Sequence, residues 1–442
     1  MKQWLISGAA WFLLQPFAFA GIPIQFWTLD NGARVYLMEV QGLPMVDIQL
    51  ELDAGSRRDG KDLSGLAQAT AMMLGKGVRA QDGMPALDEN QLGEAWADLG
   101  ASAGASVSND RMSLTLRSLT RPELLDQAIA LAARQLSAPS FPADVWKNER
   151  ERWIASLRES QTKPNVQAAE AFAKAVYGDH PYGQDPDETS LRRIEPPQMK
   201  TFHARYMVPC RAKISVVGAL NKAQVTAKLT QLLKGLPTQP ACELLPLVDE
   251  VQALSETKRI DIPFESAQAH VFIGQPGVAR QHPDFLALTV GNYVLGGGGF
   301  VSRLTEQVRE KRGLSYSVYS YFSPGQHAGA FTVGLQTRPD QAEQAIEVAT
   351  QVVSEFVKEG PSNAEVQAAK DFLIGGFALR LDSNRKLMDN LSNIAWFDLP
   401  LDYLDTWTAN VQKLSAADIQ QAFARNIQPA RMVTVVLGAS AP

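Results

Sequence analysis

The chain repeats one arrangement of hydrophobic and polar positions near its middle and again near its end. In the middle, a segment with helical spacing of apolar residues ends before Pro209, and a β-branched run, 214–218, follows and ends in glycine. The same order returns at the end, where Pro429 closes a helical segment and 434–438 is the β-branched run. A helix, a proline and a strand matched in both halves indicate an internal duplication.

Both halves also open in the same way, with two strand-like runs followed by amphipathic helices. The runs are 34–40 and 45–53 in the first half and 260–264 and 269–274 in the second. Helical periodicity dominates the rest of each half. We therefore predict an α+β fold of two homologous domains, each a mostly antiparallel β-sheet covered by α-helices, arranged as a clamshell.

The segment 238–256 is the predicted linker between these domains. Prolines at 237, 240 and 246 and several acidic residues interrupt the helical pattern there. The predicted domains are then 21–237 and 257–442. Two domains of similar size on one linker can close around a bound chain.

Residues 1–20 have the features of a secretory signal peptide. Lys2 precedes an apolar stretch, 4–17, and the small residues Ala18 and Ala20 suit cleavage after Ala20. The apolar stretch is too short to cross a bilayer, and no later stretch reaches about 18 apolar residues. We expect an exported, periplasmic protein with no membrane span.

Charge and cysteine content narrow the possible functions. The formal net charge is −5 and no basic run occurs, which argues against nucleic acid as a partner. The two cysteines, Cys210 and Cys242, would meet an oxidising environment after export, where a disulfide can form. Two buried free thiols are the alternative, because the sequence does not show whether the two residues meet in space.

The densest pattern lies in the second half, between residues 293 and 337. Four glycines, 296–299, precede a helix with apolar positions over 301–308, and Gly313 ends that helix. Two strand-like runs follow, 316–322 and 330–335. No Gly-Lys-Ser or Gly-Lys-Thr follows the glycines, so they predict a flexible loop and not a phosphate-binding loop.

Three segments together resemble the pitrilysin/insulinase (inverzincin) family of zinc metallopeptidases. They are 53–77, which contains Gly65-Leu-Ala, then His180-Pro-Tyr-Gly183, and finally 295–316. In that family an inverted zinc motif, His-x-x-Glu-His, follows Gly-Leu-Ala. The resemblance covers nearly all of the chain after the predicted signal peptide, and it implies a peptide or an unfolded protein as substrate.

The zinc motif itself is missing. Gln68 and Met72 stand where the family has its two zinc histidines, and Ala71 stands where it has the glutamate that activates water. These positions share one face of a helix, which is why the motif can hold a metal with a base beside it. Alanine offers no ligand, and amide and thioether groups are poor ligands for hydrolytic zinc. We expect no metal or other cofactor in this chain, and we expect zinc in a partner subunit.

The family's third zinc ligand is a glutamate further along, in a helix rich in glutamate and arginine. The ungapped position falls near Ser156, and the register leaves Glu151 and Glu159 undecided. Without the histidines, a solvated helix face is the simpler interpretation of these acids.

The resemblance also implies a second set of site residues, which this chain keeps. In the family an arginine and a tyrosine seven residues apart reach the bound peptide near its scissile carbonyl, and Arg309 and Tyr316 match that spacing. A guanidinium and a phenol that donate to a developing oxyanion lower the barrier to hydrolysis. The alternative is structural, because an arginine near a helix C-terminus stabilises the helix dipole and a strand tyrosine ordinarily packs.

Strand addition, in which an extended substrate pairs with a free sheet edge, is a further implication of the resemblance. It points to 100–116, where Ala103, Gly104, Ala105 and Ser106 are small enough for another backbone to approach. The alternative is that small residues simply form a poor strand.

Three functional hypotheses result. In the first, a homologous partner carries His-x-x-Glu-His, and this chain is the substrate-binding subunit of a heterodimeric zinc peptidase, inactive alone, that contributes Arg309 and Tyr316. In the second, it is an inactive scaffold or peptide-binding chamber. A relocated metal site is the third, and it is the weakest because the five histidines include no i, i+4 pair. The retained arginine and tyrosine favour the first hypothesis.

Overall fold

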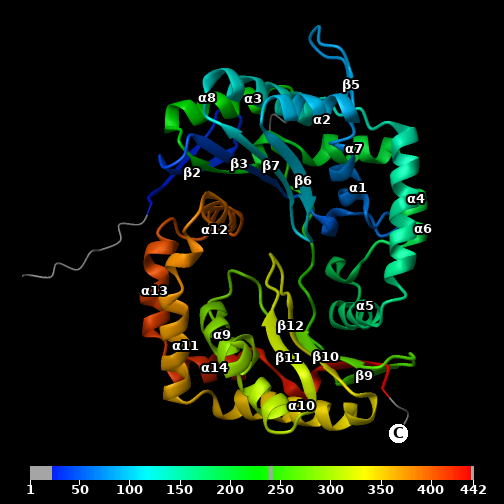
Figure 1. Ribbon diagram of the computed structural model, residues 1–442, viewed down its shortest axis with the longest axis vertical. Coiled ribbons are helices and arrows are strands. Elements are labelled where there is room, and N and C mark those ends of the chain that lie inside the picture. The colour runs from blue at the N-terminus through cyan, green and yellow to red at the C-terminus, as the bar shows by residue number, and fades with distance from the viewer. Residues whose placement is uncertain (1–21, 238–241, 440–442) are drawn as a thin grey trace, which may run out of the picture.

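The computed structural model describes residues 22–237 and 242–439, so the predicted signal peptide lies outside the described residues. Each half of the chain forms one large sheet with helices packed around it, and the two halves face each other (Figure 1). We refer to 22–237 as the first half and to 257–439 as the second half. The exact domain limits stay a prediction.

The first half contains a six-stranded sheet in the order β1-β2-β8-β3-β7-β6. Its neighbouring strands are antiparallel except for the parallel pair of β2 and β8. The strands are β1 (Ile24–Thr28), β2 (Arg34–Glu39), β3 (Met45–Leu52), β6 (Ser102–Val107), β7 (Met112–Leu119) and β8 (Lys213–Gly218), with a separate short pair, β4 (Gly77–Val78) and β5 (Leu87–Asp88). The helices are α1 (Leu66–Met73), α2 (Glu89–Asp98), α3 (Pro122–Ser137), α4 (Ala143–Ser160), α5 (Pro164–Tyr177), α6 (Glu188–Arg193), α7 (Pro196–Tyr206) and α8 (Lys222–Leu232).

The second half contains a five-stranded sheet in the order β11-β12-β10-β13-β9, antiparallel except for β13 and β9. The strands are β9 (Lys258–Ile262), β10 (Ala269–Pro276), β11 (Ser315–Phe322), β12 (Ala330–Thr337) and β13 (Val433–Leu437). The helices are α9 (Phe285–Asn292), α10 (Ala342–Glu359), α11 (Asn363–Gly375), α12 (Asn384–Trp396), α13 (Tyr403–Lys413) and α14 (Ala416–Asn426).

The two sheets have the same topology. The order β2-β8-β3-β7-β6 corresponds strand by strand to β9-β13-β10-β12-β11, and the single parallel pair occupies the same place in both. The repeated proline segments lead into β8 and β13, which lie at equivalent positions. The fold predicted from the sequence, an α+β clamshell of two homologous units with mostly antiparallel sheets, is confirmed. Strands β6 and β11 are therefore counterparts, and each is the free edge of its sheet.

Each half sends one helix across to the sheet of the other half. Helix α5 of the first half packs on β10 and β13, where Phe172 is buried against the second sheet. Helix α12 of the second half packs on β8 and β3, where Leu391 is buried with Tyr36 and Met38 (Figure 1). Successive residues of β2 alternate between the two faces, because Val35 and Leu37 contact the helices of the first half while Tyr36 and Met38 contact α12.

The tips of two hairpins connect the halves directly. Asp110, in the β6–β7 turn, accepts a hydrogen bond from the Tyr182 hydroxyl and pairs with Arg57 at 3.1 Å. In the β11–β12 loop, the Gln326 backbone N–H donates to Asp110 (2.9 Å) and that of His327 donates to the Tyr182 hydroxyl (3.2 Å). We call these five residues the hairpin junction. The segment His180–Gly183 noted in the sequence supplies its tyrosine, and burial together with Asp110 raises the pKa of Tyr182.

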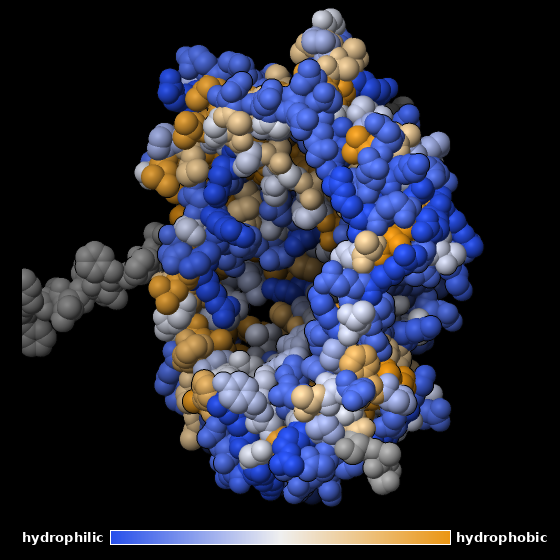
Figure 2. All heavy atoms as spheres, turned by 45° about the vertical axis from the view of Figure 1, so that its right-hand side comes forward, coloured by the Kyte–Doolittle hydropathy of each residue, from blue (hydrophilic) through white to orange (hydrophobic). Residues whose placement is uncertain are grey.

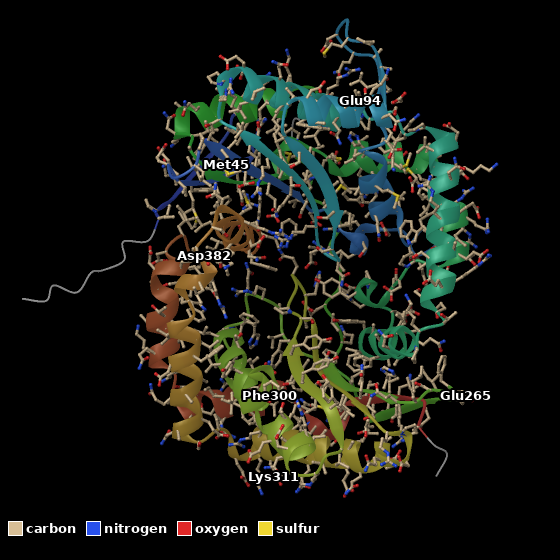
Figure 3. All side chains as sticks on the ribbon, in the orientation of Figure 1. Met45, Glu94, Glu265, Phe300, Lys311 and Asp382 are labelled. Atoms are coloured by element: carbon tan, nitrogen blue, oxygen red, sulfur yellow. A yellow bond between two sulfur atoms is a disulfide. The ribbon has the colours of Figure 1, made fainter. Side chains whose placement is uncertain are left out.

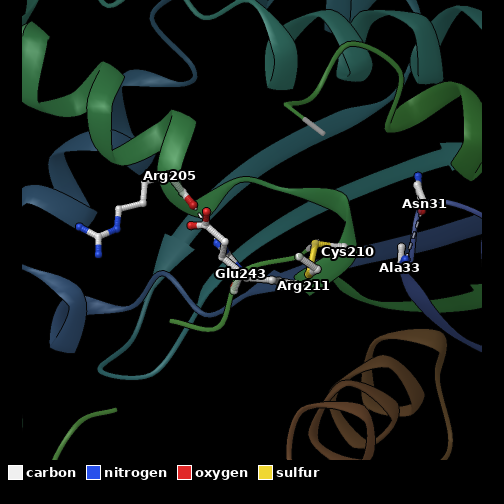
Figure 4. The surroundings of a disulfide bond; sticks show 7 residues. Asn31, Ala33, Arg205, Cys210, Arg211 and Glu243 are labelled. Atoms are coloured by element: carbon white, nitrogen blue, oxygen red, sulfur yellow. Dashed lines mark hydrogen bonds between the residues drawn. A yellow bond between two sulfur atoms is a disulfide. The ribbon is translucent and has the colours of Figure 1, made fainter. Parts of the chain in front are cut away.

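The described part of the predicted linker, 242–256, contains neither helix nor strand. A disulfide joins its first residue, Cys242, to Cys210 just before β8 (Figure 4). The bond closes a loop with a sequence separation of 32 residues, for which the chain-entropy model gives roughly 3 to 4 kcal/mol of stabilisation. Within the described residues we find no helix with the length and hydrophobicity that a membrane crossing requires.

Candidate functional site

A deep hollow separates the two halves (Figure 2), and helix α1 belongs to the half above it. Asp59 fixes the start of this helix, because its carboxylate accepts the backbone N–H groups of Gly65 and Ala67, both at 2.8 Å. Burial raises the pKa of Asp59 to about 7, although these hydrogen bonds oppose the rise. Gly65 adopts φ +99°, which favours glycine. Asp59 precedes α1 in the chain, and its hydrogen bonds thus fix the position at which the helix begins.

The three positions of the lost zinc motif lie on this helix with different exposure. Gln68 is exposed, Met72 is half-buried and Ala71 is buried in the first-half core. Across residues 22–237 and 242–439, no three His, Cys, Asp or Glu side chains gather in a way that would hold a metal ion. The side chains that α1 carries offer neither imidazole nor carboxylate for metal chemistry.

Among the glutamates of α4, Glu149 has a partner just beyond α1, and the sequence analysis did not select it. Glu149 pairs with Lys76, three residues past the end of α1, at 2.7 Å. Trp153, one turn further along α4, lies against Gly65 at the start of α1. Glu151 instead pairs with Arg192 (3.0 Å), and Glu159 with Lys163 (3.6 Å). The spacing of Glu149 and Trp153 on one face of α4 is the signal that could have identified it.

The structure brings Arg309 and Tyr316 together in the second half. After α9 the chain forms three short turns, η4 (Tyr293–Gly297), η5 (Gly299–Val301) and η6 (Thr305–Glu310), and then enters β11. The helix predicted over 301–308 is shifted and wound as a π-type turn, a rare geometry that is frequent at functional sites. Its apolar positions Leu304 and Val308 are buried.

The Arg309 guanidinium lies between two aromatic rings. Its Cζ is 4.8 Å from the ring centre of Phe300 and 5.0 Å from that of Tyr316. The side chain of Tyr316 is largely free, with 80% of the residue exposed. The polar contact found for Arg309 is a 3.4 Å approach of Nε to the adjacent Glu310. The rings therefore hold the guanidinium while most of its N–H donors stay available.

These residues line one groove along the free edge of the second-half sheet. The groove has a volume of about 560 Å³, and its walls are the strand residues 316–321 on one side and Asn292, Gly296, Gly297, Gly299 and Phe300 on the other. The Asn292 amide donates to the carbonyl of Ser320 (2.9 Å), which fixes the two walls to each other. The arrangement can present two hydrogen-bond donors to a carbonyl or carboxylate, but its lining contains no general base.

The pair does not meet the degenerate zinc positions of its own chain. The loop after β11 reaches the first half at the hairpin junction, whereas Tyr316 lies near the opposite end of that strand. Six residues of extended strand separate these ends by roughly 20 Å. Figure 1 accordingly shows α1 in the upper half and β11 in the lower half.

The small residues 103–106 form most of strand β6, the free edge of the first-half sheet. Gly104, Ala105 and Ser106 are exposed, and Ala103 is half-buried. The inner side of β6 pairs with β7, for example Gly104 with Thr115. The outer side is open to another strand.

Comparison with known proteins identifies the family. The model described as Insulinase (Peptidase family M16) matches residues 34–187, and the model described as Peptidase M16 inactive domain matches residues 193–373. A crystal structure of a peptidase M16 inactive domain from Pseudomonas fluorescens is 32% identical, with a TM-score of 0.88, and the alignment covers 95% of this chain and 98% of that one. This chain belongs to the M16 peptidase family.

Other M16 relatives differ in how they are described. A protein of Helicobacter pylori named non-peptidase homolog is 27% identical over 88% of both chains. An uncharacterized zinc protease of Mycobacterium leprae is 25% identical over 82% of this chain and 80% of its own. The periplasmic protease PqqL of Escherichia coli shares the fold, with a TM-score of 0.80 and 16% identity over 95% of this chain but 46% of PqqL. The family thus includes chains named as peptidases and chains named as non-peptidases.

Proposed function

We propose that this protein is the substrate-binding, zinc-free subunit of a two-chain periplasmic M16 peptidase. A homologous partner carries His-x-x-Glu-His and the zinc ion, and this chain contributes Arg309 and Tyr316 to the shared site. The observation that carries the proposal is the isolation of this pair. The two side chains are stacked and accessible, yet they lie in the opposite half from α1, so they can serve a zinc site only if another chain brings it.

The chemistry of the pair fits this role. When a zinc-activated water attacks a peptide bond, negative charge develops on the carbonyl oxygen. The Arg309 guanidinium and the Tyr316 hydroxyl can both donate to that oxygen, and donors already in position need little reorganisation in the transition state. Because Gln68, Ala71 and Met72 supply neither zinc ligands nor a base, this chain is inactive alone.

The proposed substrate is a peptide or an unfolded protein in extended form. The open outer side of β6, with Ala103, Gly104, Ala105 and Ser106, supports binding by strand addition. The disulfide between Cys210 and Cys242 supports an oxidising compartment. The predicted signal peptide and the fold shared with a periplasmic protease support the same location.

The test is turnover of an unstructured fluorogenic peptide by the complex of this chain with its zinc-bearing partner. Tyr316→Phe should lower kcat by about 10²- to 10³-fold, the usual effect of removing one oxyanion donor. Arg309→Ala should lower kcat by a similar factor. Arg312→Ala is the matched control, because Arg312 is exposed and binds the Gln307 carbonyl (2.8 Å) on the same turn. It should keep the normal rate.

Association and metal content complete this experiment. Both variants should still bind the partner, and the isolated chain should contain no stoichiometric zinc. Normal rates for Tyr316→Phe and Arg309→Ala in an associated complex would overturn the proposal. The second candidate, a scaffold or peptide-binding chamber without a catalytic contribution, would then lead, and the relative named non-peptidase homolog favours it.

A further inference from the structure

Phe300 is exposed in a way that packing does not explain. It follows the four glycines, 73% of the residue is accessible, and its ring forms one wall of the groove beside β11. Figure 3 shows it in the lower half, beside the strands of the second-half sheet. Apolar rings normally contribute stability through burial. An exposed ring that contacts a cation points to a different role.

Hydrogen bonds fix the turn that carries Phe300 on both sides of this residue. The Ser302 hydroxyl donates to the Gly299 carbonyl at 2.8 Å, which closes the turn around Phe300. Arg303 then binds Glu365 of α11 through two hydrogen bonds of 2.7 Å each. Gly299 has φ +59°, which lets the chain reverse there. The hydrogen bonds on both sides of Phe300 therefore fix the backbone that carries its ring.

Arg303 and Arg309 each lie over an aromatic ring, but they differ in their hydrogen bonds. A carboxylate occupies the donors of Arg303, so its guanidinium is fixed but not available to a ligand. Arg309 has the rings of Phe300 and Tyr316 at 4.8 and 5.0 Å from its Cζ, and a ring face attracts a guanidinium without using its N–H donors.

We infer that Phe300 is a positioning residue for the Arg309 guanidinium, which it holds against Tyr316 so that both donors point into the same groove. The inference rests on the proposed function, because it assigns Phe300 to that same carbonyl-binding pair. It adds a third member that neither hydrogen-bonds the substrate nor takes part in the chemistry. Its effect should appear in kcat, since loss of orientation weakens a contact that matters most in the transition state.

The test compares three substitutions at this position in the complex with the zinc-bearing partner, with the same fluorogenic peptide. Phe300→Ala should lower kcat about 2- to 5-fold and leave KM unchanged, the range expected from loss of one exposed cation–π contact. Phe300→Tyr should retain normal turnover because it keeps the ring. Phe300→Leu should behave like Phe300→Ala, although it keeps most of the apolar bulk. Val301→Ala is the matched control, since the neighbouring valine is 74% exposed.

A double-mutant cycle separates this inference from the proposed function. In an Arg309→Ala background, Phe300→Ala should have no further effect on kcat, because the group that it positions is gone. If Arg309→Ala itself keeps full activity, the proposed function fails. If Arg309→Ala is impaired but Phe300→Ala is normal, or if Phe300→Leu matches Phe300→Tyr, the positioning role is wrong. Weakened partner binding by Phe300→Ala would also overturn it, because the ring would then belong to the subunit interface.

Discussion

Glu51 illustrates how a single buried charge makes stability depend on pH. It lies on β3 with 0% exposure, and burial raises the pKa of its carboxyl to about 7. The Arg111 guanidinium, 2.5 Å away, lowers the pKa and so limits the rise. A carboxyl whose pKa is higher in the folded state than in the unfolded state binds its proton more tightly when folded. The free energy of unfolding should therefore fall as pH rises from about 4.5 to 7, and then level off.

Substitution of Glu51 by glutamine should remove the part of this dependence that Glu51 contributes, while the part from Asp59, whose pKa burial also raises to about 7, should remain. A shift of this size corresponds to at most about 3 kcal/mol between the two ends of the range. Denaturant unfolding at several pH values from 4.5 to 8 would measure it. The profile of Glu51→Gln should be flatter than that of the wild type, whereas Glu94→Gln, on the exposed surface of α2, should follow the wild type. Parallel profiles for wild type and Glu51→Gln would contradict the assignment.

At the same scale, the sequence predicted two candidate site residues but not the residue beside them. Arg309 and Tyr316 match the spacing of the family that the chain resembles, and the structure places their side chains close together, while their function stays a prediction. Phe300 was missed, because its contact with Arg309 depends on a chain reversal at Gly299 that spacing does not encode. Contacts made through space across a turn or between helices are not visible in linear spacing.

At the scale of elements, the two exchanged helices should link the stability of one half to side chains of the other. Leu391 belongs to α12 of the second half but packs on the first-half sheet with Tyr36 and Met38. Leu391→Ala should cost about 2 to 5 kcal/mol of unfolding free energy, as for other fully buried leucines. Much of this loss of stability should appear as faster amide hydrogen exchange in β3 and β8, which are far from Leu391 in the sequence.

The control for this substitution lies on the same helix. Arg385 is on the exposed side of α12, so Arg385→Ala should change stability by about 0.5 kcal/mol or less and leave exchange in β3 and β8 unaltered. Faster exchange confined to the second half after Leu391→Ala would show that α12 is not part of the first-half core.

The exchange itself could not be predicted from the sequence, although most of the elements could. Alternation of apolar residues indicated strands at 45–53 and 269–274, and β3 and β10 lie there. The pattern in α5 and α12 gives each helix an apolar face, but an apolar face does not specify which sheet covers it. The π-type winding near Arg309 was also missed, because helical periodicity at this length does not separate the two windings.

At the scale of the whole molecule, the duplication makes β6 and β11 the same edge in two copies. One copy carries the small residues proposed for strand addition, and the other carries Tyr316. Under the proposed function, the first-half edge of a zinc-bearing homologue would face the second-half edge of this chain, where Tyr316 lies. The repeat and the clamshell were predictable from sequence. The homologous partner carrying His-x-x-Glu-His was implied only by the family resemblance, and it stays a prediction.

The angle between the halves should depend on the hairpin junction. Asp110 is 6% exposed and joins both hairpin tips, because it accepts from Tyr182 and from the Gln326 backbone and pairs with Arg57. Asp110→Ala would leave the buried guanidinium of Arg57 without one of its two carboxylate partners and the Gln326 N–H without an acceptor. Breaking such a buried pair costs about 3 to 5 kcal/mol.

Thermal unfolding would measure that loss, and small-angle scattering would show whether the clamshell opens. Asp340→Ala is the control, because Asp340 forms an exposed pair with Arg338 at 2.7 Å and should contribute at most about 1 kcal/mol. Tyr182→Phe is a milder variant in case Asp110→Ala does not fold. It should cost about 1 to 3 kcal/mol, because Asp110 loses one of its hydrogen bonds and the His327 N–H loses its acceptor. Equal stability of Asp110→Ala and Asp340→Ala, with an unchanged radius of gyration, would mean that the exchanged helices alone set the angle between the halves.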